Sequence, residues 1–382
     1  MNRLIYSNTV ACPDLRYVTG FDAPDPFLWF QTDTLNAMVV SQLEYGRALK
    51  QRRPEVTVID ANHIRTFFQL PAETPPEAAR DAFTRLVDAV AKGTGCREWS
   101  VPMDFPFGYA RKMQDLFLKL EAASPFAPGR SVKSAWEIEA IRHGERLAEA
   151  GLAAADAMLA EAVVGADDAL VYRGEPLTAE MLRGAIDAAI AGLGGVATGT
   201  IAAPGPQGAD PHQSGSGPVY AHTPIIFDIF PQDQRTGYCG DLTRTRVKGA
   251  APQQVLRAYE AVLEVQRRAL AALKPGVLGA ELQRMTEEFF KERGYETGRD
   301  KATGLYHGFF HGLGHAVGLE VHDQGPALNR SGTTPLVPGH IVTVEPGIYY
   351  PEWGGIRIED TVAITEDGID NLAVADKRLV IE

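Results

Sequence analysis

The sequence predicts an α/β protein with two domains, and three observations support this prediction. The chain has 382 residues, enough for two domains of about 100 to 200 residues each. Roughly the first 120 residues mix short β-like runs with helical ones. Beyond them, two amphipathic helices followed by a β-hairpin occur twice, an order typical of a pseudo-twofold α/β unit. We therefore expect one domain over residues 1–130 and a larger one over residues 131–382.

Composition excludes several classes of protein. With 45% hydrophobic and 23% charged residues, the chain is neither disordered nor collagen-like. A net charge of -12 disfavours binding to nucleic acid or to anionic membranes. The three cysteines, Cys12, Cys96 and Cys239, are odd in number and far apart, which argues against a disulfide framework or a thiolate zinc site and favours a reducing cytoplasm. We find no signal-peptide pattern and no apolar run of about 20 residues, so we expect neither export nor a membrane span.

Local signals predict the elements of the first domain in order. The runs Asn36–Val40 and Val56–Ile59 are strand-like, and a helix is expected over Pro76–Lys92, with proline at its start and Gly93 just past its end. The segment SPFAPGRSVKS, which starts at Ser124, then interrupts the pattern. We place the domain boundary near residue 130.

The second domain begins with a capping box and then repeats its element order. Ser134 with Glu137 three residues later predicts the start of a long helix. Hydrophobic periodicity and stop signals predict four helices, at Ser134–Ala160, Thr178–Leu193, Pro252–Leu273 and Gly279–Arg293. Each helix pair precedes a hairpin, one over Ile225–Val247 and the other over Ile341–Ile364. This recurrence predicts two similar halves packed together.

The two hairpins carry acidic residues at matching places. The first contains Asp228 and Asp241, the second contains Glu345 and Glu359, and a threonine follows two positions after the second acid of each pair. Buried carboxylates are rare unless they are paired or bind a metal. Two carboxylates about 4 Å apart repel by about 4 kcal/mol at an effective dielectric constant of 20. A cluster of four therefore indicates divalent cations.

A histidine-rich segment offers a nitrogen ligand for the same site. HGFFHGLGHAVGLEVHD contains His307, His311, His315 and His322. The spacing of the first three could place them on one helix face, but the intervening glycines make a helix improbable. We predict a strand and a bend that the glycines permit.

These motifs resemble the pita-bread metallopeptidases, the family that includes methionine aminopeptidase, aminopeptidase P, prolidase and creatinase. EPGIYYP and GIRIEDT are highly specific, and LRYVTGF (Leu15–Phe21) resembles the opening strand of the creatinase-like N-terminal domain. The resemblance covers nearly the whole chain and implies a creatinase-like α/β domain followed by a pita-bread catalytic domain. It implies five metal ligands, namely Asp228, Asp241, His315, Glu345 and Glu359.

The resemblance also implies roles for other residues and a cofactor. His322 matches the histidine that contacts the substrate carbonyl, and His311 and His212 match two further active-site histidines of the Xaa-Pro branch. Arg357 matches the arginine of the GxRIED motif, and Glu345 would move the proton of the attacking water to the leaving nitrogen. Two divalent ions are expected, manganese first, with cobalt or zinc as alternatives.

One spacing departs from the family pattern. Family hairpins commonly separate the two aspartates by eleven positions, whereas Asp228 and Asp241 are thirteen apart. Both numbers are odd, so a turn that is two residues longer keeps the strand parity of the family pattern, and the ligand geometry can survive. Asp233, in that turn, is the nearest rival ligand.

The most specific function implied is that of a prolidase, which hydrolyses Xaa-Pro dipeptides. Aminopeptidase P, which acts on longer peptides with proline in second position, is the alternative, and a non-catalytic peptide or chromatin binder of the same fold is a remote one. A dipeptidase must recognise the proline carboxylate, and Arg330 or Arg47 is our candidate for that contact. By family, a homodimer is expected.

Overall fold

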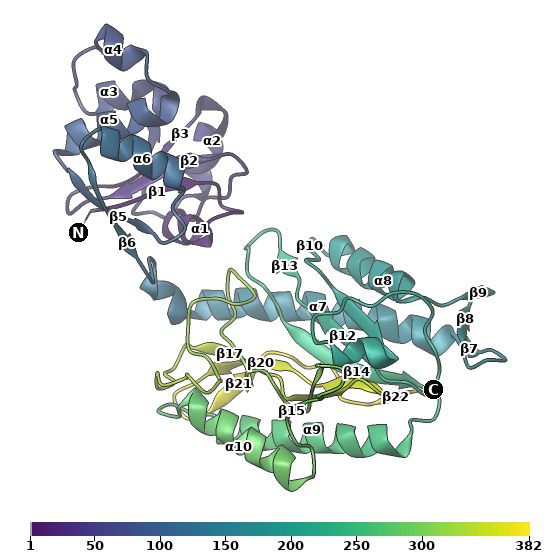
Figure 1. Ribbon diagram of the computed structural model, residues 1–382. Coiled ribbons are helices and arrows are strands. Elements are labelled where there is room, and N and C mark those ends of the chain that lie inside the picture. The colour runs from purple at the N-terminus through teal and green to yellow at the C-terminus, as the bar shows by residue number, and fades with distance from the viewer. Residues whose placement is uncertain (1) are drawn as a thin grey trace. The chain divides into compact units, whose positions relative to one another are not determined.

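The structure is a computed structural model that describes residues 2–382. It divides into two compact units, Met1–Pro128 and Gly129–Glu382, here called the N-terminal unit and the C-terminal unit (Figure 1). The division falls within the Ser-, Pro- and Gly-rich segment that starts at Ser124. None of the described helices is both long enough and apolar enough to cross a bilayer.

A six-stranded mixed sheet forms the centre of the N-terminal unit. Its strands, in spatial order, are β4 (Thr57–Asp60), β3 (Asn36–Val40), β2 (Phe27–Gln31), β1 (Arg3–Ser7), β5 (Glu98–Pro102) and β6 (Lys119–Ala123). Strands β1, β2 and β3 pair antiparallel, whereas the β3–β4, β1–β5 and β5–β6 pairs are parallel. Alternate residues face opposite ways, so that Leu28 and Phe30 join one hydrophobic core while Phe27 and Trp29 join another. The sheet is therefore covered on both faces.

Helices supply the two covering layers of the N-terminal unit. They are α1 (Pro13–Thr19), α2 (Gln42–Gln51), η1 (Ala61–His63), α3 (Ile64–Phe67), α4 (Pro75–Ala78), α5 (Ala82–Thr94) and α6 (Phe107–Asp115). The single helix expected over Pro76–Lys92 is wrong, because Asp81 accepts the backbone N–H of Thr84 and starts a new helix. Gly93 lies inside that helix, where an added Cβ would come within 2.2 Å of the Phe68 ring. Gly95, at φ 72°, ends the helix instead.

The segment Leu15–Phe21, expected to be the opening strand, is mostly helical. Pro13 occupies the first turn of α1, where a missing N–H does no harm, and Gly20 at φ 71° ends the helix. The opening strand is β1, which starts at Arg3. These caps outweighed the β-branched residues of the segment.

The first half of the C-terminal unit begins as predicted. The capping box of Ser134 and Glu137 is present, which confirms the start of the long helix. The elements are η2 (Pro128–Ser131), α7 (Ala135–Glu161), β7 (Val163–Val164), β8 (Leu170–Tyr172), β9 (Glu175–Pro176), α8 (Ala179–Gly192), β10 (Gly195–Val196), β11 (Ile201–Pro204), η3 (Gly205–Ala209), β12 (Ile225–Ile229), β13 (Gln232–Asp233) and β14 (Leu242–Lys248). Strands β12 and β14 pair antiparallel, with Asp228 opposite Thr243. The predicted first hairpin is therefore confirmed.

The second half repeats the order but not the simple hairpin. Its elements are α9 (Gln253–Ala272), α10 (Gly279–Glu292), β15 (Gly298–Arg299), β16 (Tyr306–His307), β17 (Ile341–Val344), β18 (Gly347–Tyr350), β19 (Gly354–Arg357), β20 (Asp360–Ile364), β21 (Ile369–Asn371) and β22 (Val380–Ile381). Strands β17 and β20 pair antiparallel, and an inner hairpin of β18 and β19 lies between them in sequence. The hairpin expected over Ile341–Ile364 is thus two consecutive ladders with a break between them.

The C-terminal unit contains two hydrophobic cores. Helices α7 and α8 pack on one side of the strands and α9 and α10 on the other (Figure 1). In the first core, Leu152 and Ile186 lie with Phe227 of β12, and in the second, Val262 and Leu282 lie with Val342 and other strand residues. The acidic residues of the hairpins lie among the strands between these helix layers.

Candidate metal centre

The strands of both halves bring the five candidate ligands to one cleft. Its volume is about 780 Å³, and its lining includes Asp228, Asp241, His315, Glu345 and Glu359. The two aspartates come from β12 and from the residue before β14, and the two glutamates come from the residues after β17 and before β20. His315 comes from the loop between β16 and β17, where glycines prevent a helix as expected. The pseudo-repeat therefore assembles acids that lie far apart in the sequence.

The imidazole of His315 is oriented for binding a metal. Its Nδ1 lies 3.2 Å from the carbonyl oxygen of Ala316. A carbonyl can only accept, so Nδ1 carries the proton and Nε2 keeps its lone pair. Nε2 lies 3.5 Å from Asp241 Oδ2 and 3.4 Å from Glu345 Oε1. Ligand atoms of Asp241, His315 and Glu359 all lie within 4.8 Å of one another.

The electrostatics of the cleft favour a bound cation. Burial and the neighbouring carboxylates of Glu359 and Asp228 raise the pKa of Asp241 well above its usual range. Burial, followed by the charges of Glu345 and Asp228, does the same to the pKa of Glu359. The buried Asp228 Oδ1 accepts no hydrogen bond in the described structure. A buried carboxylate oxygen without a partner is costly, so these residues fit divalent cations.

Threonines from each half form hydrogen bonds with candidate ligands of the other half. Thr243 Oγ1 donates to Glu359 Oε2 at 2.6 Å, and the Glu359 N–H donates to the Thr243 carbonyl at 3.0 Å. Thr361 Oγ1 donates in turn to the Asp241 carbonyl at 2.9 Å. These are the threonines that the sequence places two positions after each second acid. The exchange fixes one half against the other at the ligands themselves.

Glu145 also positions a candidate ligand, although our sequence analysis missed it. Its Oε1 accepts the backbone N–H of Asp241 at 2.7 Å, and the residue is fully buried. Helix α7 approaches closely here, because a Cβ on Gly144 would lie 2.4 Å from the Gly240 nitrogen. The available signal was an acid on the apolar face that Ile141 and Ala148 mark.

A chain of hydrogen bonds connects His311 to Asp228. Arg357 Nη2 donates to Asp228 Oδ2 at 2.6 Å, and Arg357 Nη1 donates to the Tyr349 hydroxyl at 3.0 Å. His311 Nδ1 donates to the Gly312 carbonyl at 2.7 Å, so its Nε2 accepts the Tyr349 hydroxyl at 2.8 Å. Burial, with the charge of Arg357, lowers the pKa of His311 to about 3. His311 is therefore a neutral acceptor.

His322 stands beside the candidate ligand His315 on an anchored loop. The two rings lie 4.1 Å apart between centroids at 78°. The next residue, Asp323, is a buried carboxylate that contacts Arg130 Nη2 and lies 3.5 Å from Lys133 Nζ. It also accepts the N–H of Leu319 at 3.1 Å. The segment that precedes α7 thus anchors the loop that carries His322.

Of two further predicted residues, His212 lines the cleft and Asp233 does not. His212 is exposed and lines the cleft. Asp233 accepts the N–H groups of Arg235 and Thr236, so it serves the turn and does not line the cleft.

Neither candidate arginine lines the cleft among the described residues. Arg330 is exposed and pairs with Glu287 at 2.8 Å in a neighbouring pocket of about 570 Å³. Arg47 belongs to the N-terminal unit, where it pairs with Glu44 at 2.5 Å.

Comparisons with known proteins show which family the C-terminal unit resembles in sequence. The family model of metallopeptidase family M24 matches residues 139–366. The Xaa-Pro dipeptidase of Pyrococcus furiosus is 42% identical over 143 residues, 37% of this chain and 38% of that protein. The Xaa-Pro dipeptidase of Pyrococcus horikoshii is 38% identical, with the same coverage. These matches thus span less than half the length of the curated relatives.

Solved structures resemble the chain over nearly its full length. A prolidase from Pyrococcus horikoshii matches with a TM-score of 0.77 and 25% identity, over 99% of this chain and 95% of that one. An X-Pro aminopeptidase from Thermotoga maritima matches with a TM-score of 0.81 and 23% identity, over 100% and 97%. These similarities confirm the predicted α/β fold class with its pita-bread catalytic region.

Proposed function

Because this chain belongs to metallopeptidase family M24, we propose that it is a prolidase that hydrolyses Xaa-Pro dipeptides in the cleft of the C-terminal unit. The observation that carries the proposal is that four acids and one imidazole lone pair line a single cleft, with ligand atoms of Asp241, His315 and Glu359 within 4.8 Å of one another. The Xaa-Pro dipeptidases among its relatives add support for the substrate class.

The five candidate ligands would hold two divalent cations, manganese before cobalt or zinc. The mixed oxygen and nitrogen set suits all three ions. When bound, such a pair lowers the pKa of a water and polarises the scissile carbonyl. The ligands are Asp228, Asp241, His315, Glu345 and Glu359.

The other residues of the cleft would position and protonate the substrate. His322, beside His315, would donate to the carbonyl oxygen of the scissile bond. Glu345 Oε1 would take a proton and return it to the leaving nitrogen. Arg357 holds Asp228 directly, and the Tyr349 hydroxyl connects His311 to Arg357. The exposed His212, which lines the cleft, would contact the substrate.

Proline as the second residue explains why such a site is needed. The nitrogen of an Xaa-Pro bond is tertiary and has no hydrogen to donate, so the substrate must be recognised without it. The cleft lining includes apolar side chains suited to a pyrrolidine ring, among them Ile201, Phe230, Phe310 and Tyr349.

Recognition of the proline carboxylate requires a cationic side chain near the cleft. Arg357 is the only arginine or lysine among the residues that line the described cleft, and it already pairs with Asp228. Arg330 could contact the carboxylate only by leaving Glu287, and we keep it and Arg47 as candidates for a contact of about 1.5–3 kcal/mol.

A second function, that of an Xaa-Pro aminopeptidase, has one observation in its favour. The neighbouring pocket that holds Arg330 shares Phe310, His311, Gly312 and Asn329 with the cleft. A peptide longer than two residues could extend from the cleft into this space. A non-catalytic binder has less support, because no ligand has been replaced.

Product analysis tests these alternatives. The purified protein, supplied with Mn²⁺, is incubated with Ala-Pro, Ala-Pro-amide and Ala-Pro-Ala. A prolidase releases proline fastest from Ala-Pro, and Arg330→Gln should slow Ala-Pro by about 10- to 150-fold while sparing the amide. Faster cleavage of Ala-Pro-Ala supports the aminopeptidase, and no cleavage of any substrate refutes both enzymes.

Two further features are proposals of the same kind. The odd number and wide spacing of the three cysteines support a reducing, cytoplasmic location. Family membership supports a homodimer, which the molar mass in solution would test.

A further inference from the structure

Helix α9 carries a glutamine that is completely buried. Gln266 is 0% exposed and lies on the helix face that packs against the strands of the second half. A buried side-chain amide is costly unless its donors and acceptor are all satisfied. The partners of Gln266 therefore indicate why an amide occupies a core position.

Both donors of this amide reach the backbone next to the candidate ligands. Gln266 Nε2 lies 3.1 Å from the Val344 carbonyl oxygen and 3.1 Å from the Ile358 carbonyl oxygen. Val344 directly precedes Glu345, and Ile358 directly precedes Glu359. One side-chain nitrogen thus connects the two segments that carry the glutamate ligands.

These segments meet where the strand pairing is interrupted. The β17–β20 ladder ends at the Val344–Asp360 pair, and the β18–β19 ladder ends at the Gly347–Arg357 pair. Both ligand glutamates lie in the interval between the ladders, which a 3.4 Å bond from the Ile358 N–H to the Pro346 carbonyl also crosses. The amide supplies the connection that regular pairing does not.

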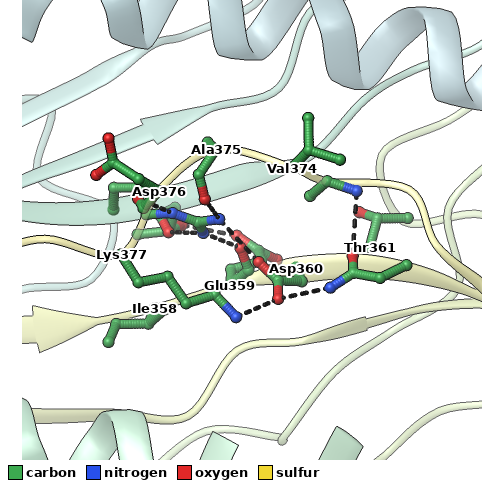
Figure 2. Close-up of polar contacts among 12 residues, drawn as sticks. Ile358, Glu359, Asp360, Thr361, Val374, Ala375, Asp376 and Lys377 are labelled. Atoms are coloured by element: carbon green, nitrogen blue, oxygen red, sulfur yellow. Dashed lines mark hydrogen bonds and ion pairs between the residues drawn. The ribbon is translucent and has the colours of Figure 1, made fainter. Parts of the chain in front are cut away.

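The orientation of the amide is fixed by a cation. Lys377 Nζ donates to Gln266 Oε1 at 2.8 Å, and because an ammonium only donates, the oxygen must face it. The same ammonium contacts Asp360, the residue after Glu359, as Figure 2 shows. Asp360 is held from its other oxygen by Arg244 at 2.9 Å. The C-terminal segment thus orients the amide and secures the strand that follows Glu359.

We propose that Gln266 is a positioning residue for the metal centre, because its amide sets the separation of the Glu345 and Glu359 carboxylates. The inference rests on the proposed two-metal centre. Groups that orient metal ligands typically contribute 10- to 100-fold to metal affinity.

Calorimetric titration of the metal-free, full-length protein with Mn²⁺ tests the proposal. Gln266→Met keeps the length of the side chain and removes both donors. We expect the weaker of the two binding steps to lose about 10- to 100-fold in affinity. The hyperfine pattern of the spin-coupled manganese pair should also change, a signature of altered separation that ordinary destabilisation does not produce.

The neighbouring core residue provides the matched control. Val265, also 0% exposed on α9, contacts the hydrophobic core, and Val265→Ala should lower stability with little effect on Mn²⁺ affinity or spectrum. Equal losses in Val265→Ala and Gln266→Met would overturn the proposal. So would wild-type binding by a folded Gln266→Met protein.

A second variant covers the case in which Gln266→Met fails to fold. Lys377→Met leaves the amide in place without its orienting cation and should lower the affinity of the weaker Mn²⁺-binding step. Lys377→Arg keeps a cation at this position and should bind Mn²⁺ with an affinity close to that of wild type. Unchanged binding in Lys377→Met, when Gln266→Met does not fold, counts against the proposal. A wild-type protein that binds fewer than two ions would instead overturn the proposed centre itself.

Discussion

Replacing Asp323 by asparagine should strongly destabilise the C-terminal unit. The substitution removes one charge and almost no volume from a carboxylate that is 1% exposed between Arg130 and Lys133, which are 3% and 1% exposed. Removing one partner of a buried ion pair costs about 3–5 kcal/mol, because the remaining charge stays buried. For a domain of this size each kcal/mol lowers Tm by about 2–4 °C, so we expect a fall of about 6–20 °C.

Scanning calorimetry at a fixed metal concentration measures this effect, and Glu320→Gln is the matched control. Glu320 contacts the same guanidinium of Arg130 at 2.7 Å but is 46% exposed. Exposed pairs contribute about 0–1 kcal/mol, so this variant should melt within a few degrees of wild type. Below its Tm, Asp323→Asn should also lose kcat, because His322 is the adjacent residue. Equal Tm shifts in the two variants would refute the reasoning from burial.

Three further predictions concern the ligands, the neighbouring histidine and pH. Asp241→Ala should lose bound manganese and Ala-Pro hydrolysis together, and full metal content by elemental analysis would remove Asp241 from the ligand set. His322→Ala should retain its metal and lose about 100-fold in kcat, whereas a raised KM alone would assign His322 to ground-state binding. Burial, with the nearby Lys133, lowers the pKa of His340, so the unfolded chain binds a proton that the folded chain does not. Stability should therefore fall as pH drops below about 6.5, and an equally steep fall in His340→Gln would contradict this cause.

Local signals explain what the sequence could predict. The start of α7 follows from Ser134 and Glu137, and the end of α10 follows from Gly294, because each signal acts within one helical turn. The break between α4 and α5 was missed because Asp81, its cap, lies inside an otherwise helical pattern. The strand expected at Leu15–Phe21 was wrong for a similar reason, because Pro13 and Gly20 favour the start and the end of a short helix there.

The four acids could be found from residue type and pattern, and the family resemblance singled out His315, but the residues that position these side chains were not predicted. Acids repeated at matching places in two apolar hairpins can be recognised in the sequence itself. Gln266 is separated by 78 positions from Val344, and Glu145 by 96 from Asp241, so only the folded chain relates them. Arg330 was proposed as a substrate contact for its position between His322 and Glu345 in the sequence. That position does not reveal that its guanidinium pairs with Glu287 in the folded chain.

The exchange of hydrogen bonds between the two halves has a consequence for biosynthesis. Asp228 and Asp241 leave the ribosome before His315, Glu345 and Glu359, and Asp241 meets its Thr361 partner later still. A nascent chain therefore carries two acids without the imidazole, the other carboxylates or the threonine that complete the site. Under the proposed function, hydrolytic competence would arise only after the second half has been synthesised and has docked on the first, so a product truncated within the second half would remain inert towards cellular peptides.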